Sequence, residues 1–500
     1  MFKSRKSGIL LHISSLPGRH GIGDLGSCAY DFVDKLELMG QAFWQILPTN
    51  EPNGNNSPYD TNSAFAQNPL FISLDLLYAD NLLDEKDIES AKEIDEVKID
   101  FDKLKKLKEP LITKAAKVFQ IKNNHEMDKS FKTFCDENTF WLHQYAIYKV
   151  LKDKFNQSPW YEWSREIRTY NESKIKNILK DYYEEIEIIK IIQFLFYKQW
   201  LSLKTYANKK NISLIGDLPI YVSHDSVDVW TNQLLYQLNE NGGLIVKSGC
   251  PPDYFIETGQ VWGHPIYNWE EHSKDGFGWW VKRISFLSEL VDMIRFDHFN
   301  GLLKYWEIPA ENNTAIIGNW KRGPGKELIQ KLYDNVQRIK IIAEDLGELS
   351  TEVAELRSFK NIPGMKVFQF DFDNICKEIN ENKVLFTGTH DNDTLVGWYK
   401  KELRKLFDNN SIRFRSDELR QIISRNSKYI HLDIIKYCME TKYPLVIIPL
   451  QDLIGLNGDC RMNEPGTLNE ANWSWKSITE DISDNLIETI NTITYNSGRT

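Results

Sequence analysis

The stretch "MIRFDHFNG" (residues 293–301) decides how the rest of this 500-residue sequence is interpreted. An apolar run carries Arg295 and Asp297 two residues apart and breaks at Gly301. Side chains two residues apart in a strand point to the same face of the sheet. The two charges are therefore expected side by side at the end of a buried strand. They form either a structural salt bridge or a catalytic carboxylate that its neighbour holds ionised.

Seven other short apolar runs occur along the chain, and most of them also end in polar or charged residues followed by Gly, Pro or Asn. Continuous apolar runs, as opposed to alternating ones, are typical of parallel strands that are covered on both faces. Helix-like stretches such as 323–338 lie between several of them. Eight buried strands with helical connections predict an α/β fold, a (β/α)8 TIM barrel with its functional residues at the C-terminal strand ends. The other runs are 8–17, 42–49, 212–222, 339–347, 364–372, 384–393 and 444–452.

Two segments depart from this repeating pattern. Residues 73–208 are rich in Lys, Glu, Ile and Asn, and their helical spacing predicts a helical insertion between the second and third strands. Residues 248–265 form a long, irregular stretch of Gly, Pro and aromatic residues, which favours a lid loop over the site. The prediction is one catalytic domain over 1–500 that contains this helical subdomain and this lid, with further loop insertions at the C-terminal face of the barrel.

Composition excludes several classes of protein. A hydrophobic content of 41% supports a large core, and a net charge of −10 argues against a nucleic-acid or anionic-membrane partner. The six cysteines lie far apart, which indicates reduced thiols and neither a disulfide framework nor a zinc site. The apolar run before His12 is too short for a signal peptide, and no window reaches the ~20 apolar residues of a membrane span. We therefore expect a cytoplasmic protein with no cofactor and no metal, while the oligomeric state stays open.

One glycine-rich motif favours a different class of protein. "GIGDLG" (21–26) matches the G-x-G-x-x-G fingerprint of dinucleotide-binding folds, and Glu51 lies about 25 residues further on. The fingerprint needs its first glycine directly after the strand, whereas Pro17 and Gly18 already make a turn here. A loop that closes over the barrel mouth is the preferred interpretation, and an NAD-dependent enzyme stays open as an alternative.

Acidic residues end four of the predicted strands. For any single one, a turn or an ion pair is a sufficient explanation, because Asp favours strand-to-loop turns. Four acids at equivalent places in a barrel converge on one spot, and convergent carboxylates suit glycoside chemistry, which needs an acid for the leaving oxygen and a carboxylate facing the oxocarbenium ion. Trp262, Trp306 and Trp398 lie in or near the same loops and offer rings on which sugars stack. The four acids are Asp217, Asp297, Glu344 and Asp391.

A set of motifs in sequence order resembles a known family, the 4-α-glucanotransferases of the amylomaltase type (disproportionating enzymes, glycoside hydrolase family 77). The resemblance runs from residue 8 to about 475. "GQVWGHP" (259–265) and "SPY…SAFA" are specific to this family, whereas the barrel acids are shared with all relatives of α-amylase. The motifs are "LLHISSLPGRHGIGDLG", "NSPYDTNSAFAQNP", "GDLPIYV", "PPDYFIETGQVWGHP", "RFDHF", "AEDLG" and "HDND".

The resemblance implies a retaining enzyme that moves an α-1,4-glucan segment from a maltooligosaccharide to the 4-hydroxyl of an acceptor, through a covalent glucosyl-enzyme intermediate. It makes Asp297 the nucleophile, Glu344 the general acid and base, and Asp391 the residue that binds ring hydroxyls in the −1 subsite. Physical reasoning agrees, since Arg295 should keep Asp297 ionised and nearby negative charge should raise the pKa of Glu344. The implied substrate-binding residues are Arg295, His390, Tyr59, Asp217, Gln260 and Trp262.

Two further functions stay open for the same residues. An α-glucan hydrolase of the α-amylase superfamily would turn maltotriose only into shorter products, whereas a transferase would build a ladder of longer glucans. A non-catalytic glucan-binding protein would need the aromatic residues but not the full set of acids.

Overall fold

Parallel strands form the centre of the protein. The computed structural model describes residues 2, 4–91, 98–122, 124–252, 257–347, 350–372, 375, 382–403 and 427–500, and within them eight strands form one sheet in the order β10-β11-β12-β1-β2-β3-β6-β9. The amide of Ala343 donates to the carbonyl of Pro363 at 2.8 Å, which brings β9 beside β10 and nearly closes the sheet. Each of the eight predicted runs overlaps one of these strands, so the predicted (β/α)8 barrel is confirmed. They are β1 (Lys6–Leu10), β2 (Phe43–Gln45), β3 (Ser213–Leu218), β6 (Met293–Phe296), β9 (Ile341–Ala343), β10 (Gly364–Val367), β11 (Lys383–Phe386) and β12 (Leu445–Pro449).

Both faces of this sheet are buried, which explains why the strands read as continuous apolar runs. One core cluster takes a residue from every strand and fills the barrel: Leu10, Phe43, Ile215, Met293, Ile342, Met365, Val384 and Leu445. Their neighbours Ile9, Ile294 and Ile341 belong to a second, larger cluster that the surrounding helices share. Side chains in a strand alternate between faces, so adjacent apolar residues supply the two clusters in turn.

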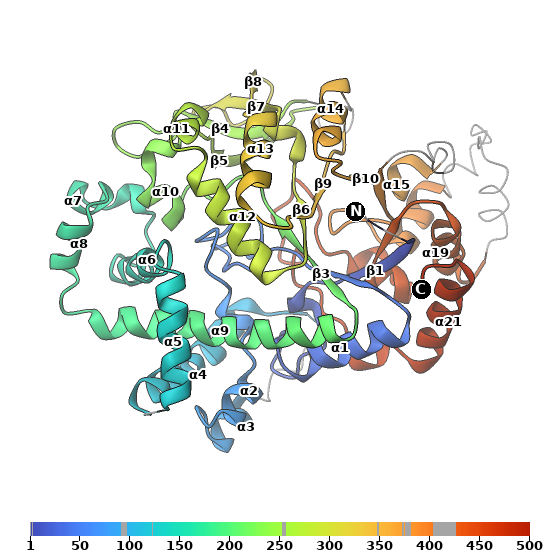
Figure 1. The fold of residues 1–500 in the computed structure, drawn as a ribbon, viewed down its shortest axis with the longest axis horizontal. Helices are drawn as coiled ribbons and strands as arrows, with labels where there is room; N and C mark the ends of the chain where they lie inside the picture. The colour runs from blue at the N-terminus through green and yellow to red at the C-terminus, as the bar shows by residue number, and fades with distance from the viewer. Residues whose placement is uncertain are drawn as a thin grey trace.

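The chain between β2 and β3 is helical (Figure 1). The long helix α9 packs against α4, α5 and α6, and also against α1 (Ser27–Leu38) beside the barrel. The division of the chain into a catalytic domain with a helical subdomain at 73–208 stays a prediction. The helices are α2 (Leu74–Ala79), α3 (Glu85–Ala91), α4 (Phe101–Ile121), α5 (His125–Glu137), α6 (Leu142–Lys154), α7 (Arg165–Arg168), α8 (Glu172–Ile178) and α9 (Tyr183–Lys209).

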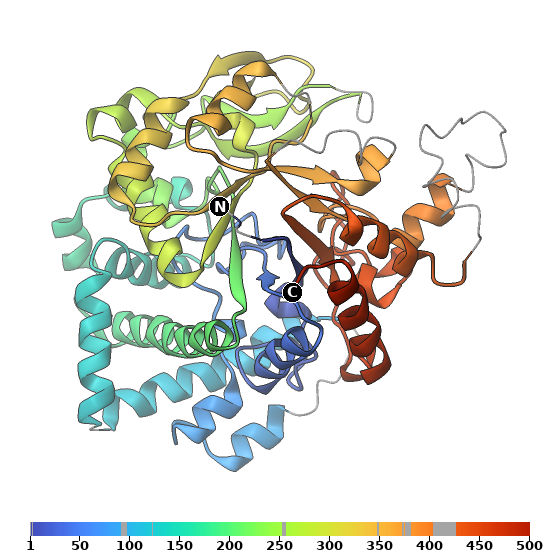
Figure 2. The ribbon, with the colours of Figure 1, turned by 45° about the vertical axis from the view of Figure 1, so that its right-hand side comes forward.

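A second, antiparallel sheet is built from the loops that follow β3 and β6. Its order is β5-β4-β7-β8, with β4 (Val246–Cys250), β5 (Gln260–Pro265), β7 (Lys304–Pro309) and β8 (Asn319–Arg322). Figures 1 and 2 show it at one edge of the molecule, on the opposite side from α2 and α3. The predicted lid at 248–265 thus begins and ends in strands, while Tyr254 and Phe255 fall outside the described residues. The lid itself stays a prediction.

The remaining helices surround the barrel or follow its strands (Figure 2). None of the helices in the described ranges is both long and apolar enough to cross a membrane. These helices are α10 (Val227–Thr231), α11 (Trp269–Lys274), α12 (Gly278–Leu290), α13 (Lys326–Asn335), α14 (Thr351–Phe359), α15 (Phe368–Asp371), α16 (Leu395–Trp398), α19 (Ile430–Glu440), α20 (Leu450–Ile454) and α21 (Asp484–Asn496).

The glycine-rich motif at 21–26 is buried and belongs to the core of the barrel fold. A Cβ atom on Gly23 would come within 1.9 Å of the carbonyl oxygen of Ile13, so only glycine allows the backbone to approach this closely. Asp24 lies 3.8 Å from the ammonium group of Lys108, a fully buried residue of α4. The motif therefore packs the loop after β1 against the helical region, which accounts for its glycines without a nucleotide.

Candidate active site

A large cleft opens where the parallel strands end. Its volume is about 2400 Å³, and eight of the nine predicted site residues line it. The ninth, Asp217, is buried next to Arg295 and Tyr59, which belong to the cleft wall. The eight lining residues are Tyr59, Gln260, Trp262, Arg295, Asp297, Glu344, His390 and Asp391.

Arg295 bridges two carboxylates. Asp217 and Arg295 are partners in the register between β3 and β6, and the guanidinium donates to both oxygens of Asp217 at 2.8 and 2.7 Å. The same nitrogen of Arg295 lies 3.0 Å from Oδ1 of Asp297. Tyr59 donates its hydroxyl to Asp217 at 2.8 Å. The structural salt bridge and the contact with Asp297 therefore coexist, and the first of them holds the arginine in place for the second.

Glu344 is held by the backbone around Asp297. The amide of His298 donates to Oε2 of Glu344 at 2.7 Å, and the amide of Leu346 donates to Oε1 at 3.1 Å. His298 has a φ of 48°, a left-handed conformation that turns the chain sharply after the strand. Burial first, and the negative charge of Asp297 second, raise the pKa of Glu344 to about 7, against the opposing effects of Arg295 and the two amides. The direction agrees with the sequence-based expectation, which named only the charge.

Asp391 reaches the cleft from the loop after β11 and is fixed by a distant segment. Asn463 donates from its side-chain amide to Oδ1 of Asp391 at 2.7 Å and from its backbone to the carbonyl of His390 at 3.0 Å. Arg461 donates to the carbonyl of Asp391 at 2.8 Å. Sequence reasoning missed Arg461 and Asn463. Their segment, "RMNEPGT" (461–467), lies in the loop after the last strand, and its Pro and Gly mark only a turn.

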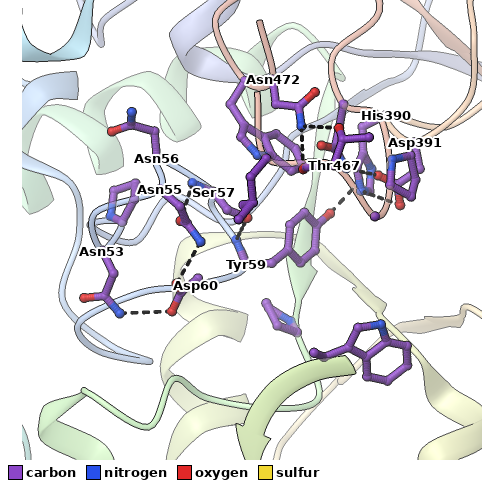
Figure 3. A pocket seen from close by; sticks show the side chains of 18 of the residues that line it. Asn53, Asn55, Asn56, Ser57, Tyr59, Asp60, His390, Asp391, Thr467 and Asn472 are labelled. Carbon is purple, nitrogen blue, oxygen red and sulfur yellow. Dashed lines mark hydrogen bonds and ion pairs between the residues drawn. The ribbon is translucent and has the colours of Figure 1, made fainter. Parts of the chain in front are cut away.

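Tyr59 links His390, in the loop after β11, to Asp217 at the end of β3, and Figure 3 shows its contact with His390. Its ring stacks on His390 with centroids 5.0 Å apart, and its hydroxyl lies 3.5 Å from Nδ1 of that histidine. In the same stretch of chain, Asn53 and Asn55 donate to Asp60 at 3.0 and 2.9 Å, as Figure 3 shows. Polar side chains thus line the cleft wall around Tyr59.

The predicted tryptophans divide between the cleft and the second sheet. Trp262 donates to Oε1 of Gln260 at 3.0 Å and meets the ring of His298 edge-on at 4.9 Å. Trp398 also lines the cleft. Trp306 lies in β7, where its ring contacts Trp320 at 5.3 Å. The first two offer apolar surface to a ligand in the cleft, and the third packs within the sheet.

Comparison with known proteins identifies the family. The family model for 4-alpha-glucanotransferases, glycoside hydrolase family 77, matches residues 11–480. The chain belongs to this family. It is 39% identical over 492 residues to a 4-alpha-glucanotransferase of Streptococcus pneumoniae, covering 96% of this chain and 94% of that one. It is 38% identical to the chloroplastic/amyloplastic 4-alpha-glucanotransferase of Solanum tuberosum, over 96% of this chain and 84% of that one.

Solved structures agree with this glucanotransferase assignment. An amylomaltase from Streptococcus agalactiae in complex with acarbose superposes with a TM-score of 0.91 at 34% identity, over 99% of both chains. The amylomaltase of Corynebacterium glutamicum shares the fold with a TM-score of 0.79 at 17% identity, over 99% of this chain and 75% of that one. The predicted family and enzyme class are confirmed, and the hydrolase and the non-catalytic binding protein are not favoured.

Proposed function

We propose that this 4-alpha-glucanotransferase transfers α-1,4-glucan segments by double displacement, with Asp297 as nucleophile, Glu344 as acid and base, and Asp391 as a ligand of the −1 sugar. The observation that supports this best is the unequal surroundings of the two central acids. Arg295 lies against Asp297, while burial and the charge of Asp297 raise the pKa of Glu344 to about 7, so that about half of the molecules keep its proton at neutral pH. A nucleophile must be ionised and an acid must hold its proton, so each environment suits one role.

In the first half-reaction, a carboxylate oxygen of Asp297 attacks the anomeric carbon of the −1 sugar. Glu344 gives its proton to the glycosidic oxygen, so the bond to the leaving glucan breaks and that glucan departs with a free 4-hydroxyl at its new non-reducing end. In the second half, Glu344 takes the proton of an acceptor 4-hydroxyl. The acceptor oxygen attacks the anomeric carbon and releases Asp297, which restores the starting protonation states and the α configuration.

The other predicted residues hold this arrangement and the substrate. Asp391, fixed by Asn463, is 45% exposed and offers its carboxylate to ring hydroxyls of the −1 sugar. His390 stands beside it as a second partner for hydroxyls. Asp217 acts on Arg295 and through it on Asp297. The remaining residues, Tyr59, Gln260 and Trp262, offer the hydroxyl, amide and ring that a glucan requires.

The donor substrate is an uncharged maltooligosaccharide, and the acceptor is a glucose or a glucan. The segment 248–265 acts as a lid that shields the covalent intermediate from water, since its residues Thr258 to His264 line the cleft. Shortening it should raise hydrolysis relative to transfer, and an unchanged ratio would contradict the lid.

The proposed location of the protein is the cytoplasm, because its scattered cysteines favour a reducing compartment. Cell fractionation checks this location.

The test is incubation with maltotriose. Transfer conserves the number of glycosidic bonds, so free glucose and a ladder of longer glucans should appear while total reducing ends stay constant. Asp297→Asn removes the nucleophile at unchanged size and should lower the rate by at least about 1000-fold. Rising reducing ends would favour the hydrolase, and an unaffected Asp297→Asn variant would refute the assigned nucleophile.

A further inference from the structure

The loop that joins β11 to α16 carries His390 and Asp391 into the cleft, and a buried carboxyl group lies behind it. Asp452, in α20, is 2% exposed. Its Oδ2 accepts the hydroxyl of Thr387 at 2.8 Å, and its Oδ1 accepts the backbone amide of Leu395 at 2.7 Å. Thr387 directly follows β11 and Leu395 begins α16. One side chain therefore joins the two ends of the loop.

Packing alone does not hold the loop at this point. A cavity of about 30 Å³ lies behind it, lined among others by Thr389, His390, Asp393 and Asp452. This space is enough for one water molecule. Where the back of a loop faces a void, its position depends on hydrogen bonds. Asn463, Arg461 and Gln369 hold its middle, and Asp452 accepts one hydrogen bond from each of its two ends.

We propose that Asp452 is a positioning residue of the transferase: by joining Thr387 to Leu395, it sets where the loop presents His390 and Asp391 to the −1 sugar. Asp452 acts from behind the loop and does not touch the substrate. The inference rests on the proposed roles of His390 and Asp391. It adds a residue that no motif of the site singles out.

The carboxyl group keeps both contacts in either protonation state. Burial, together with the negative charge of Asp393, raises the pKa of Asp452 to about 7, although Leu395 and Thr387 oppose the shift. In the ionised form both oxygens accept. In the neutral form one oxygen still accepts from Leu395 and the new hydroxyl donates to Thr387, because a hydroxyl can either donate or accept. An asparagine can make the same two contacts, whereas an alanine loses both.

The experiment compares the asparagine and alanine variants at position 452. With maltotriose as substrate, Asp452→Ala should lower kcat/KM by about 10- to 100-fold, because small displacements of substrate-binding groups cost this much. Asp452→Asn should stay within about threefold of the wild type, and Thr387→Val, which loses one contact, should fall in between. Circular dichroism and thermal midpoints show whether each variant is folded. Wild-type kcat/KM in a folded Asp452→Ala variant would overturn the proposal.

A double-mutant cycle with His390→Ala separates positioning from a general structural role. If Asp452 acts through the loop, the combined loss in kcat/KM should be clearly smaller than the product of the two single losses. Losses that multiply would overturn the proposal. Asn382 lies at the far end of β11 and supplies the control. The loss in kcat/KM caused by Asn382→Ala should simply multiply with the loss caused by Asp452→Ala. If Asp452→Ala does not fold, Thr387→Val takes its place in both cycles.

The proposed function and the role of Asp452 can be refuted separately. A wild-type protein that makes no longer glucans, or an active Asp297→Asn variant, would overturn the proposed function. An active wild type and an inactive Asp297→Asn variant, with Asp452→Ala unchanged, would overturn only the role of Asp452.

Discussion

The pH dependence of transfer follows from the environment of Glu344. Its pKa is raised to about 7 from an ordinary value of 4.5. At pH 7 about 50% of the molecules then carry the proton that the leaving oxygen needs, against about 0.3% at the ordinary value. The protonated form is lost as pH rises, so the rate should fall above pH 7, to about one tenth protonated at pH 8. The raised pKa therefore increases the fraction of enzyme with a protonated Glu344 at neutral pH by a factor of more than about 100.

The assay is the initial rate of glucose release from maltotriose between pH 4.5 and 9 at constant ionic strength. Because kcat/KM reports the free enzyme, its basic limb should have a midpoint near pH 7 and a tenfold fall per pH unit. Glu344→Gln, which cannot titrate, should lack this limb at a much lower rate. A basic midpoint near pH 5 would refute the reasoning, since it would mean that burial leaves the acid unperturbed.

The two causes of the shift are separable by NMR titration of the carboxyl carbons. Asp297→Asn removes the charge and leaves the burial, which is the larger cause. The pKa of Glu344 should therefore fall in that variant but stay above its ordinary value. A complete return to the ordinary value would show that the charge of Asp297, and not burial, is responsible.

Two further predictions concern the residues that hold the site and the chain ends. Asn463→Ala removes the hydrogen bond to Asp391 and should lower kcat/KM by about tenfold, because a bond to a charged group is lost, while Asn382→Ala at the opposite barrel end should not. Arg499 is fully buried and donates to the carbonyls of four residues, Met439, Lys6, Tyr443 and Thr441. Arg499→Ala should lower the free energy of unfolding by roughly 3–5 kcal/mol, read from urea midpoints, because buried acceptors lose their donor. The half-exposed Arg19 is the control, and Arg19→Ala should change the free energy of unfolding by less than about 0.5 kcal/mol.

The barrel was predictable because its strands carry an unusually clear signal. Each strand is buried on two sides, inside the barrel and beneath the helices, so most residues of each run are apolar until the strand ends. The acids then stand out against that background. Asp297, Glu344 and Asp391 could therefore be found from local sequence alone, and the cleft brings all three together.

Partners of these residues were harder to predict because they depend on register and on distant loops. The contact of Asp217 with Arg295 needs β3 and β6 to pair in one particular register, which no local pattern specifies. Asn463 reaches Asp391 from 72 residues away in the sequence. Asp452 follows a strand in the same way as the proposed catalytic acids do, yet it lies behind the loop and does not line the cleft. An acid at a strand end thus predicts a location near the site, and only the fold tells which side of the loop it serves.

The helical region between β2 and β3 also contacts the cleft through residues that are far apart in the sequence. Two lysines of helix α6 form ion pairs with two loops. Lys149 lies 2.8 Å from Glu51, in the loop after β2, and Lys152 lies 2.6 Å from Asp225, in the loop after β3. Both loops form walls of the cleft. Loops of this length have little structure of their own, so they need external contacts to keep one conformation. The helices therefore hold two adjoining loops of the cleft wall, and they share one hydrophobic core with the barrel.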